Sequence, residues 1–195
     1  MNTALFLTIG RILLSPIFLV VYIYYQQLGI SLVVLPFMLI GLVVLAELTD
    51  LFDGFAARKK NQVTELGKIL DPMADSIFRL SVFLALTQGI IKLPLWLVLF
   101  FFYRDSVISM LRTLCALRGF TLAARFSGKV KAVVQATAAL LILVLMIPYT
   151  QGMISLNLLR DISFYIVFAA VSYSLFSGFE YLKANQSYIK KALVK

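Results

Sequence analysis

The residues best suited to chemistry are carboxylates placed at helical spacing. Six of the nine acidic residues of the 195-residue chain lie between residues 47 and 75. Residues three, four or seven apart share one face of an α-helix. The stretch reads Asp50-x2-Asp53-Gly54-x2-Ala57-Arg58-x8-Gly67-x3-Asp71-x3-Asp75. This spacing predicts two helices, each with a stripe of two carboxylates, whose stripes face one another.

Four carboxylates this close would repel one another, so an external cation is their expected partner. The chain has no histidine and a single cysteine. Oxygen ligands without histidine or cysteine select hard divalent ions. We therefore predict that Asp50, Asp53, Asp71 and Asp75 bind Mg²⁺ or Mn²⁺. They suffice for two ions, an arrangement that clamps a pyrophosphate and stabilises displacement at phosphorus.

The remaining motif residues fit a phosphate ligand. Gly54, Ala57 and Gly67 lack bulky side chains and leave room for a ligand between the two helices. Arg58 can contact a phosphate through two parallel hydrogen bonds.

Two other interpretations use the same acidic residues. In the first, Asp50 and Asp53 pair with Arg58 and Lys68 as a structural ion network. In the second, the protein is a divalent-cation transporter or channel, which needs charges along an axis through the membrane. The outer halves of the two acidic spans are apolar, which disfavours transport.

The composition of the chain indicates the class of protein to which these residues belong. Of the chain, 62% is hydrophobic and 14% is charged, with a net charge of +9. Such a chain is typical of an integral membrane protein and not of a soluble enzyme or a disulfide-rich secreted domain. The absence of histidine excludes histidine general-base chemistry. Any catalysis must use carboxylates, Lys, Arg, Tyr, Ser or Thr.

Long apolar runs predict an all-α protein with six transmembrane helices. The runs cover about residues 11–27, 31–57, 67–91, 93–116, 132–159 and 162–179. Most Lys and Arg residues of the predicted loops and termini fall on one side of the membrane. Only Lys92 and Arg160 fall on the opposite side. The positive-inside rule therefore predicts that both termini lie in the cytoplasm. The expected location of the protein is the cell (inner) membrane. A polar metal-containing cavity is then expected at the cytoplasmic side.

The complete motif resembles that of the CDP-alcohol phosphotransferases, and the resemblance extends over residues 1–195 as a single membrane domain. The resemblance implies that Asp50, Asp53, Asp71 and Asp75 hold two divalent ions. It implies that the CDP group is received by Gly54, Ala57, Arg58 and Gly67. It also implies that Asp75 is the general base that accepts the proton of the acceptor hydroxyl, which attacks the β-phosphorus and releases CMP.

Other polar residues resemble the phosphatidylglycerophosphate synthase branch, whose donor is CDP-diacylglycerol and whose acceptor is glycerol 3-phosphate. The expected acceptor-binding residues are Thr8, Arg104, Arg112, Lys129 and Lys131. Their positive charges suit an anionic acceptor. Membrane lipids are expected partners and nucleic acid is not. Homodimers occur in the family, so the resemblance also raises the expectation of a homodimer.

The chain departs from the pattern of the branch in three segments. Ala4 and Leu5 replace the usual Pro-Asn ahead of Thr8. Ser76 replaces a lysine, and Ala132 replaces a threonine. The departure at Ser76 leaves open which acceptor is used, and Arg79, one turn beyond Asp75, could supply the missing charge.

The acceptor assignment therefore has alternatives. A sibling enzyme could use inositol phosphate, serine or another alcohol, although serine does not require several basic residues. Arg112, Lys129 and Lys131 could anchor the protein at lipid headgroups. Arg104 could be neutralised structurally by Asp105 or by Asp75.

Overall fold

The protein folds into seven α-helices in the part of the chain that the structure describes. The structure is a computed structural model that describes the backbone of residues 3–59, 65–119, 122 and 125–193, and the side chains of residues 8–49, 73–119, 122 and 125–190. The helices are α1 (Thr3–Tyr24), α2 (Leu35–Lys59), α3 (Glu65–Leu86), α4 (Leu95–Leu117), α5 (Phe126–Thr150), α6 (Leu156–Ala184) and α7 (Gln186–Leu193). This confirms the all-α class.

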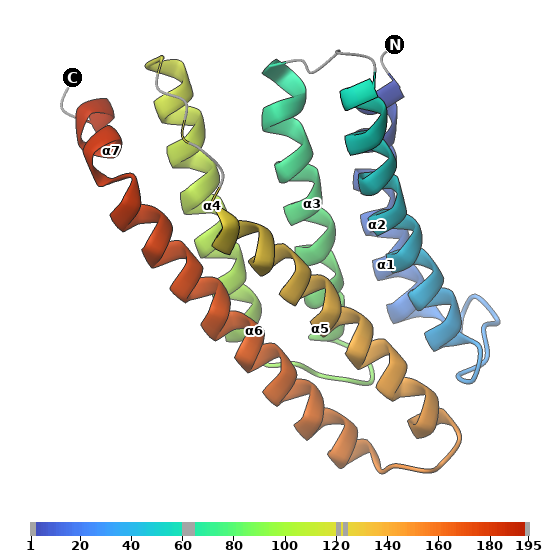
Figure 1. Ribbon diagram of the computed structural model, residues 1–195. Coiled ribbons are helices and arrows are strands. Elements are labelled where there is room, and N and C mark those ends of the chain that lie inside the picture. The colour runs from blue at the N-terminus through green and yellow to red at the C-terminus, as the bar shows by residue number, and fades with distance from the viewer. Residues whose placement is uncertain (1–2, 60–64, 120–121, 123–124, 194–195) are drawn as a thin grey trace.

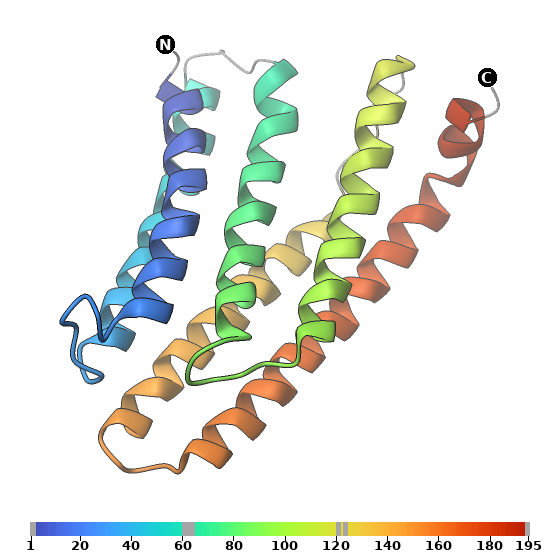
Figure 2. The same ribbon diagram turned by 180° about the vertical axis from the view of Figure 1, so that it is seen from behind.

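Successive helices from α1 to α6 run in alternate directions (Figures 1 and 2). Consequently α1 begins at the same end of the bundle as α7. The first three helices form one group, in which α1 packs against both α2 and α3. The α5–α6 pair crosses this group at an angle, and α4 packs between α3 and α6.

Two helices, α5 and α6, are long and apolar enough to cross a bilayer, and the segments Thr8–Tyr24 and Leu35–Thr49 are shorter apolar helices. At 1.5 Å per residue, the 25 residues of α5 extend about 37 Å, more than the thickness of a hydrocarbon core. Many large apolar side chains on the outside of the bundle are exposed, among them Phe102, Met110 and Phe176. An apolar exterior of this extent suits lipid contact.

The boundaries of the last helices differ from the apolar runs of the sequence. The uncharged run at residues 132–159 contains the end of α5, a turn and the start of α6. Gly152 has a φ of +74°, which glycine adopts without strain. Ser155 then caps α6 by accepting a hydrogen bond of 3.2 Å from the Leu158 N–H. Because the turn contains no charged residue, it does not interrupt the apolar run, and the hydropathy of the sequence does not show where α5 ends and α6 begins.

The end of the bundle away from the termini has an apolar core. Helices α1 to α6 all contribute fully buried side chains to it, among them Phe18, Leu39, Phe83, Phe101, Ile142 and Val167. Tyr22 lies among them, and its hydroxyl accepts a hydrogen bond from the Ile91 N–H at 3.1 Å. A Cβ on Gly89 would lie 3.1 Å from the Tyr22 ring. The loop after α3 is thereby held against α1.

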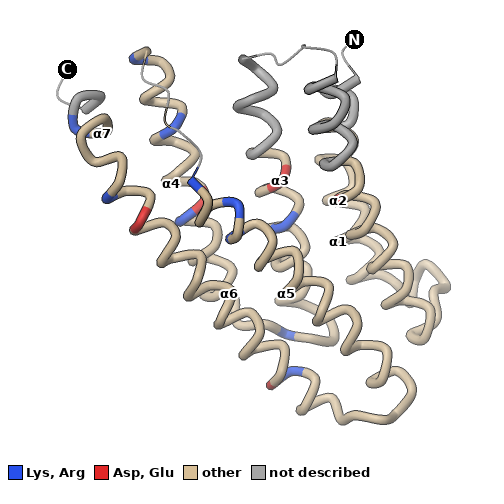
Figure 3. Tube along the Cα trace, in the orientation of Figure 1, with Lys and Arg blue, Asp and Glu red and all other residues tan. Residues whose placement is uncertain are grey.

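Charged residues concentrate toward the other end of the bundle (Figure 3). Among described residues, the exceptions are Lys92, in the loop between α3 and α4, and Arg160 and Asp161, near the start of α6. Arg160 donates to the Ile90 carbonyl at 2.9 Å. The interior therefore has a polar half and an apolar half, and the polar half contains the functional candidates.

Candidate active site

The acidic motif lies on the last turns of α2 and the first half of α3, as its spacing predicts. The side chain of Asp75 is described. Those of the other seven motif residues lie outside the described part, namely Asp50, Asp53, Gly54, Ala57, Arg58, Gly67 and Asp71. The grouping of four carboxylates thus stays a prediction. Among the described side chains, no three Asp, Glu or Cys residues are close enough to hold a metal ion.

Asp75 forms an ion pair with Arg11 of α1. The Arg11 side chain is 2% exposed and the Asp75 side chain 20% exposed, so the pair is largely shielded from solvent. Thr8 lies one turn before Arg11 and is also buried. The first helix therefore brings a guanidinium to the carboxylate that is predicted to be the general base.

Arg11 is a residue whose place in the site the sequence analysis missed. Arg11 stands at the start of the first predicted span, where the positive-inside rule alone accounts for a basic residue, yet it is buried beside Asp75. The available signal was the spacing of Thr8 and Arg11, three residues apart in the sequence. One helical turn separates the two residues, so both can face the bundle interior.

A second ion pair joins α2 to α3. Arg79 Nε lies 3.3 Å from Glu47 Oε1. The Arg79 side chain is 10% exposed and the Glu47 side chain 31% exposed. Arg11, Glu47, Asp75 and Arg79 surround a small space together with Ala46 and Phe78, and this space cannot admit a water molecule. Four side chains of alternating charge thus pack where α1, α2 and α3 meet.

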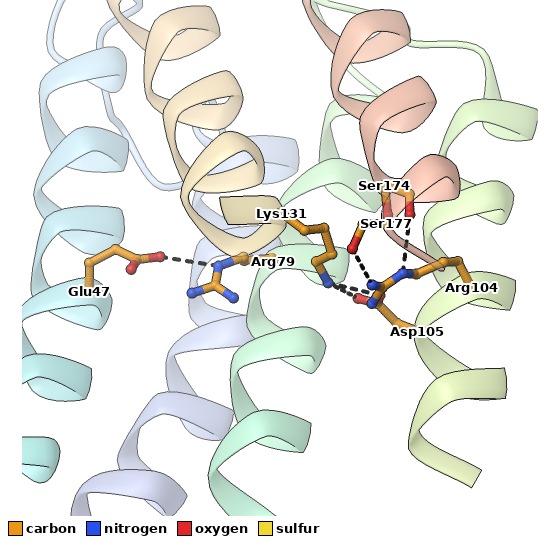
Figure 4. A network of polar contacts seen from close by, with 7 residues as sticks. All are labelled: Glu47, Arg79, Arg104, Asp105, Lys131, Ser174 and Ser177. Carbon is orange, nitrogen blue, oxygen red and sulfur yellow. Dashed lines mark hydrogen bonds and ion pairs between the residues drawn. The ribbon is translucent and has the colours of Figure 1, made fainter. Parts of the chain in front are cut away.

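The third group of charges joins α4, α5 and α6 around Asp105 (Figure 4). Lys131 Nζ donates to both carboxylate oxygens of Asp105, at 2.7 and 2.8 Å. Arg104 Nη1 donates to Asp105 at 3.0 Å, and its Nη2 donates to the Ser177 hydroxyl at 3.0 Å. We name Arg104, Asp105 and Lys131 the Asp105 cluster. It carries two positive charges against one negative charge.

Glycine makes room for this cluster. A Cβ on Gly178 would lie 3.1 Å from Arg104 Cγ, and Arg104 Nε reaches the Ser174 carbonyl at 3.3 Å. Gln135 lies one turn after Lys131 and is 1% exposed, and its Oε1 has no hydrogen-bond partner among the described residues. Polar side chains from three helices therefore meet in one buried place.

The residues expected to bind the acceptor fall into separate groups. Arg104 and Lys131 share the Asp105 cluster. Arg112 lies two turns after Arg104, donates from Nε to the Tyr181 hydroxyl at 3.2 Å, and places its guanidinium 5.2 Å from the Tyr181 ring centre. Lys129 is exposed. Of the alternatives for Arg104, the pairing with Asp105 is present, whereas Asp75 pairs with Arg11.

A groove of about 580 Å³ opens between α3 and α4 beside these charges. Its lining is mostly apolar, including Met73, Ile77, Phe102 and Met110. Ser76, at the position that departs from the branch pattern, also lines it, as does Asp105. A polar centre thus lies next to an apolar surface.

The donor set suits a hard divalent cation. The motif supplies carboxylate oxygens from two helices, the chain has no histidine, and its single cysteine, Cys115, is buried in α4. Oxygen ligands of this kind fit Mg²⁺ or Mn²⁺ better than softer metals. Combined with buried cationic groups, such a site can bind phosphates and activate a hydroxyl.

Comparison with known proteins agrees with this chemistry. The sequence model of the CDP-alcohol phosphatidyltransferase family matches residues 1–175. A protein of Bacillus subtilis (strain 168), named CDP-diacylglycerol–glycerol-3-phosphate 3-phosphatidyltransferase, is 30% identical over 190 residues, which cover 94% of this chain and 95% of the relative. A protein of the same name from Rickettsia bellii (strain RML369-C) is 33% identical, over 96% and 97% of the two chains.

A probable phosphatidylglycerophosphate synthase of Mycobacterium tuberculosis (strain CDC 1551 / Oshkosh) is 31% identical over 137 residues, which cover 70% of this chain and 63% of the relative. The family match covers most of the chain and includes both acidic helices. On the combined basis of the motif, the helical bundle and these similarities, the chain belongs to the CDP-alcohol phosphatidyltransferase family.

Proposed function

We propose that the protein transfers a phosphatidyl group from CDP-diacylglycerol to glycerol 3-phosphate, giving phosphatidylglycerophosphate and CMP in phospholipid biosynthesis. The observation that carries this proposal is the similarity, over nearly the whole length of the chain, to relatives named for that reaction. The complete acidic motif supports the transfer chemistry, and the Asp105 cluster supports an anionic acceptor.

In the proposed reaction, the acceptor hydroxyl gives its proton to the Asp75 carboxylate and its oxygen bonds to the β-phosphorus. The bond between that phosphorus and the bridging oxygen breaks, and CMP leaves with this oxygen. Arg11 holds the Asp75 carboxylate in position. Asp50, Asp53, Asp71 and Asp75 would hold two Mg²⁺ or Mn²⁺ ions, which supply positive charge to the pyrophosphate when bound.

The donor and acceptor would contact different residues. Gly54, Ala57, Arg58 and Gly67 would receive the CDP group, since they follow the first two aspartates on α2 and precede the second two on α3. Arg104 has five N–H donors, and within the described part of the chain three of its nitrogens donate to the Ser174 carbonyl, Asp105 and the Ser177 hydroxyl. Its remaining donors support a role in binding the acceptor phosphate.

Arg112, Lys129, Lys131 and Thr8 would complete the acceptor site. Lys131 lies in the same buried cluster as Arg104. Arg112 lies two turns from Arg104 on the same helix, and Thr8 lies one turn from Arg11. Lys129 is exposed and would meet the acceptor at the entrance.

The proposal places the whole chain in the membrane as a single domain of residues 1–195. Six spans, α1 to α6, would cross the cell (inner) membrane with both termini in the cytoplasm, which follows from the distribution of Lys and Arg. The polar half of the bundle would then open to the cytoplasm. A homodimer belongs to the proposal through the family resemblance alone.

Release of CMP from purified protein tests the proposal. The full chain in detergent is mixed with CDP-diacylglycerol, Mg²⁺ or Mn²⁺, and a panel of acceptors that includes glycerol 3-phosphate, inositol phosphate and serine. We expect CMP release with glycerol 3-phosphate. Release with another acceptor and none with glycerol 3-phosphate would refute the acceptor and retain the transfer reaction. No release with any acceptor would refute the proposed enzyme.

A further inference from the structure

The described residues of the two helices that carry the acidic motif make few contacts with one another. Within the described residues, α2 packs mainly on α1 and α5, and α3 mainly on α1 and α4, with fewer contacts to α5. A site built from residues of α2 and α3 nevertheless requires that the distance and the rotation between these helices be fixed. Small displacements of ligands weaken a metal site strongly, because the ligands must meet the ion together.

The Glu47–Arg79 ion pair joins α2 to α3 directly. Glu47 lies three residues before Asp50, and Arg79 lies four residues after Asp75. By helical periodicity, each partner shares a face with an acidic residue of the motif, one turn farther into the bundle. Figure 4 shows Glu47 and Arg79 extending toward one another from their two helices.

The surroundings of the pair make its geometry restrictive. Arg79 is nine-tenths buried, and the space that it shares with Arg11, Glu47 and Asp75 cannot admit a water molecule. Removing one partner would leave the other without its ion pair in a place that water does not fill, which is unfavourable. Since Arg11 contacts Asp75 in the same group, the position of α3 is set relative to both α1 and α2.

We propose that Glu47 and Arg79 are positioning residues, whose ion pair sets the spacing of α2 and α3 and thereby the affinity of the motif carboxylates for divalent cations. This inference rests on the proposed divalent-cation site. It assigns neither residue to the metal or to a substrate. Their contribution is the relative placement of two helices that few other described contacts join.

A positioning role and a long-range effect of charge predict different directions of change in cation affinity. If the two side chains acted through their charges alone, Glu47→Gln would weaken cation binding, because it leaves a positive charge nearby. Arg79→Met would strengthen cation binding, because it leaves a negative charge. A positioning role predicts that both substitutions weaken binding.

The experiment measures Mn²⁺ binding to the purified, substrate-free full chain in detergent, by the electron paramagnetic resonance signal of free Mn²⁺. The variants are Glu47→Gln, Arg79→Met and the charge-exchanged double variant Glu47→Arg/Arg79→Glu. Glu180→Gln is the matched control, because it breaks an exposed ion pair with Arg125, 3.5 Å apart, away from α2 and α3.

We expect each single substitution to weaken Mn²⁺ binding by about tenfold, as loss of a residue that orients metal ligands does. The exchanged pair should restore affinity to within about threefold of the original, and the control should leave affinity unchanged. The Mn²⁺ concentration for half-maximal CMP release should shift in parallel, whereas the KM for glycerol 3-phosphate should stay constant.

Opposite shifts for the two single variants would overturn the positioning role in favour of a charge effect. Unchanged Mn²⁺ affinity with reduced thermal stability would overturn it in favour of a purely structural role. If the single variants do not fold, the double variant Glu47→Arg/Arg79→Glu tests the inference. Weak Mn²⁺ binding by this variant in its folded state would contradict the positioning role. Failure of the unaltered protein to bind Mn²⁺ would instead refute the proposed cation site.

Discussion

Replacing Asp105 with asparagine should strongly destabilise the bundle. Asp105 is the one carboxylate of its cluster, and Lys131 Nζ lies 2.7 Å from its Oδ2. At that distance two unit charges attract by about 6 kcal/mol at an effective dielectric constant of about 20. Desolvation offsets much of this, and removing one partner of a buried pair costs roughly 3–5 kcal/mol. We expect Asp105→Asn to reduce the free energy of unfolding by this amount.

Thermal unfolding in detergent measures the loss. Cys115 is the single cysteine and is buried, so a thiol-reactive dye reports unfolding at this position. For a chain of this length, the expected loss lowers the Tm by about 10 °C. Asp161→Asn is the control, because Asp161 is exposed at the other end of the bundle, and it should change stability by less than about 0.5 kcal/mol.

A double variant separates the ion pair from other effects of the asparagine. Adding Lys131→Met to Asp105→Asn removes the buried ammonium that has lost its partner, so the double variant should recover about 1–3 kcal/mol relative to the sum of the single changes. Arg104 would keep its bonds to Ser177 and Ser174. A loss below about 1 kcal/mol for Asp105→Asn, or strictly additive changes, would refute this account of the cluster.

Three further outcomes follow from the site. Asp75→Asn should reduce CMP release by at least about 100-fold, the usual contribution of a general base, in a protein that still folds but has a lowered Tm, because the buried Arg11 loses its carboxylate partner; full activity would rule out the base role. Arg112→Ala should raise the KM for glycerol 3-phosphate more than that for CDP-diacylglycerol, and equal changes measured by steady-state kinetics would make Arg112 an anchor. Gly178→Ala should lower stability by about 1–3 kcal/mol, because its Cβ meets Arg104 Cγ at 3.1 Å; an unchanged Tm would show that Arg104 moves aside freely.

Sequence reasoning succeeded where the signal was local. The placement of the acidic motif on two successive helices followed from the spacing of Asp50, Asp53, Asp71 and Asp75, and the helices α2 and α3 have the predicted positions. Apolar runs gave the number and order of the long helices. Such patterns depend on residues within a few turns of one another, which the linear sequence displays directly.

The missed features depend on contacts between distant segments. Arg11 and Asp75 are 64 residues apart, and Asp105 and Lys131 are 26 apart. A basic residue near a span boundary has the same local pattern whether it contacts lipid headgroups or turns inward. The helix α7 was missed because it is short and contains Lys190 and Lys191, so a search for apolar runs does not include it.

The apolar core of the far half limits how solutes can move through the bundle. Phe18, Phe83, Phe101 and Met146 are fully buried there, and the buried charges of the described chain lie in the other half. A hydrated ion crossing this core would lose its water without gaining polar ligands. In the proposed orientation, acceptor and CMP would therefore enter and leave on one side of the bilayer. No charge would cross the transmembrane voltage during turnover, and the reaction would proceed at the same rate in energised and de-energised membranes.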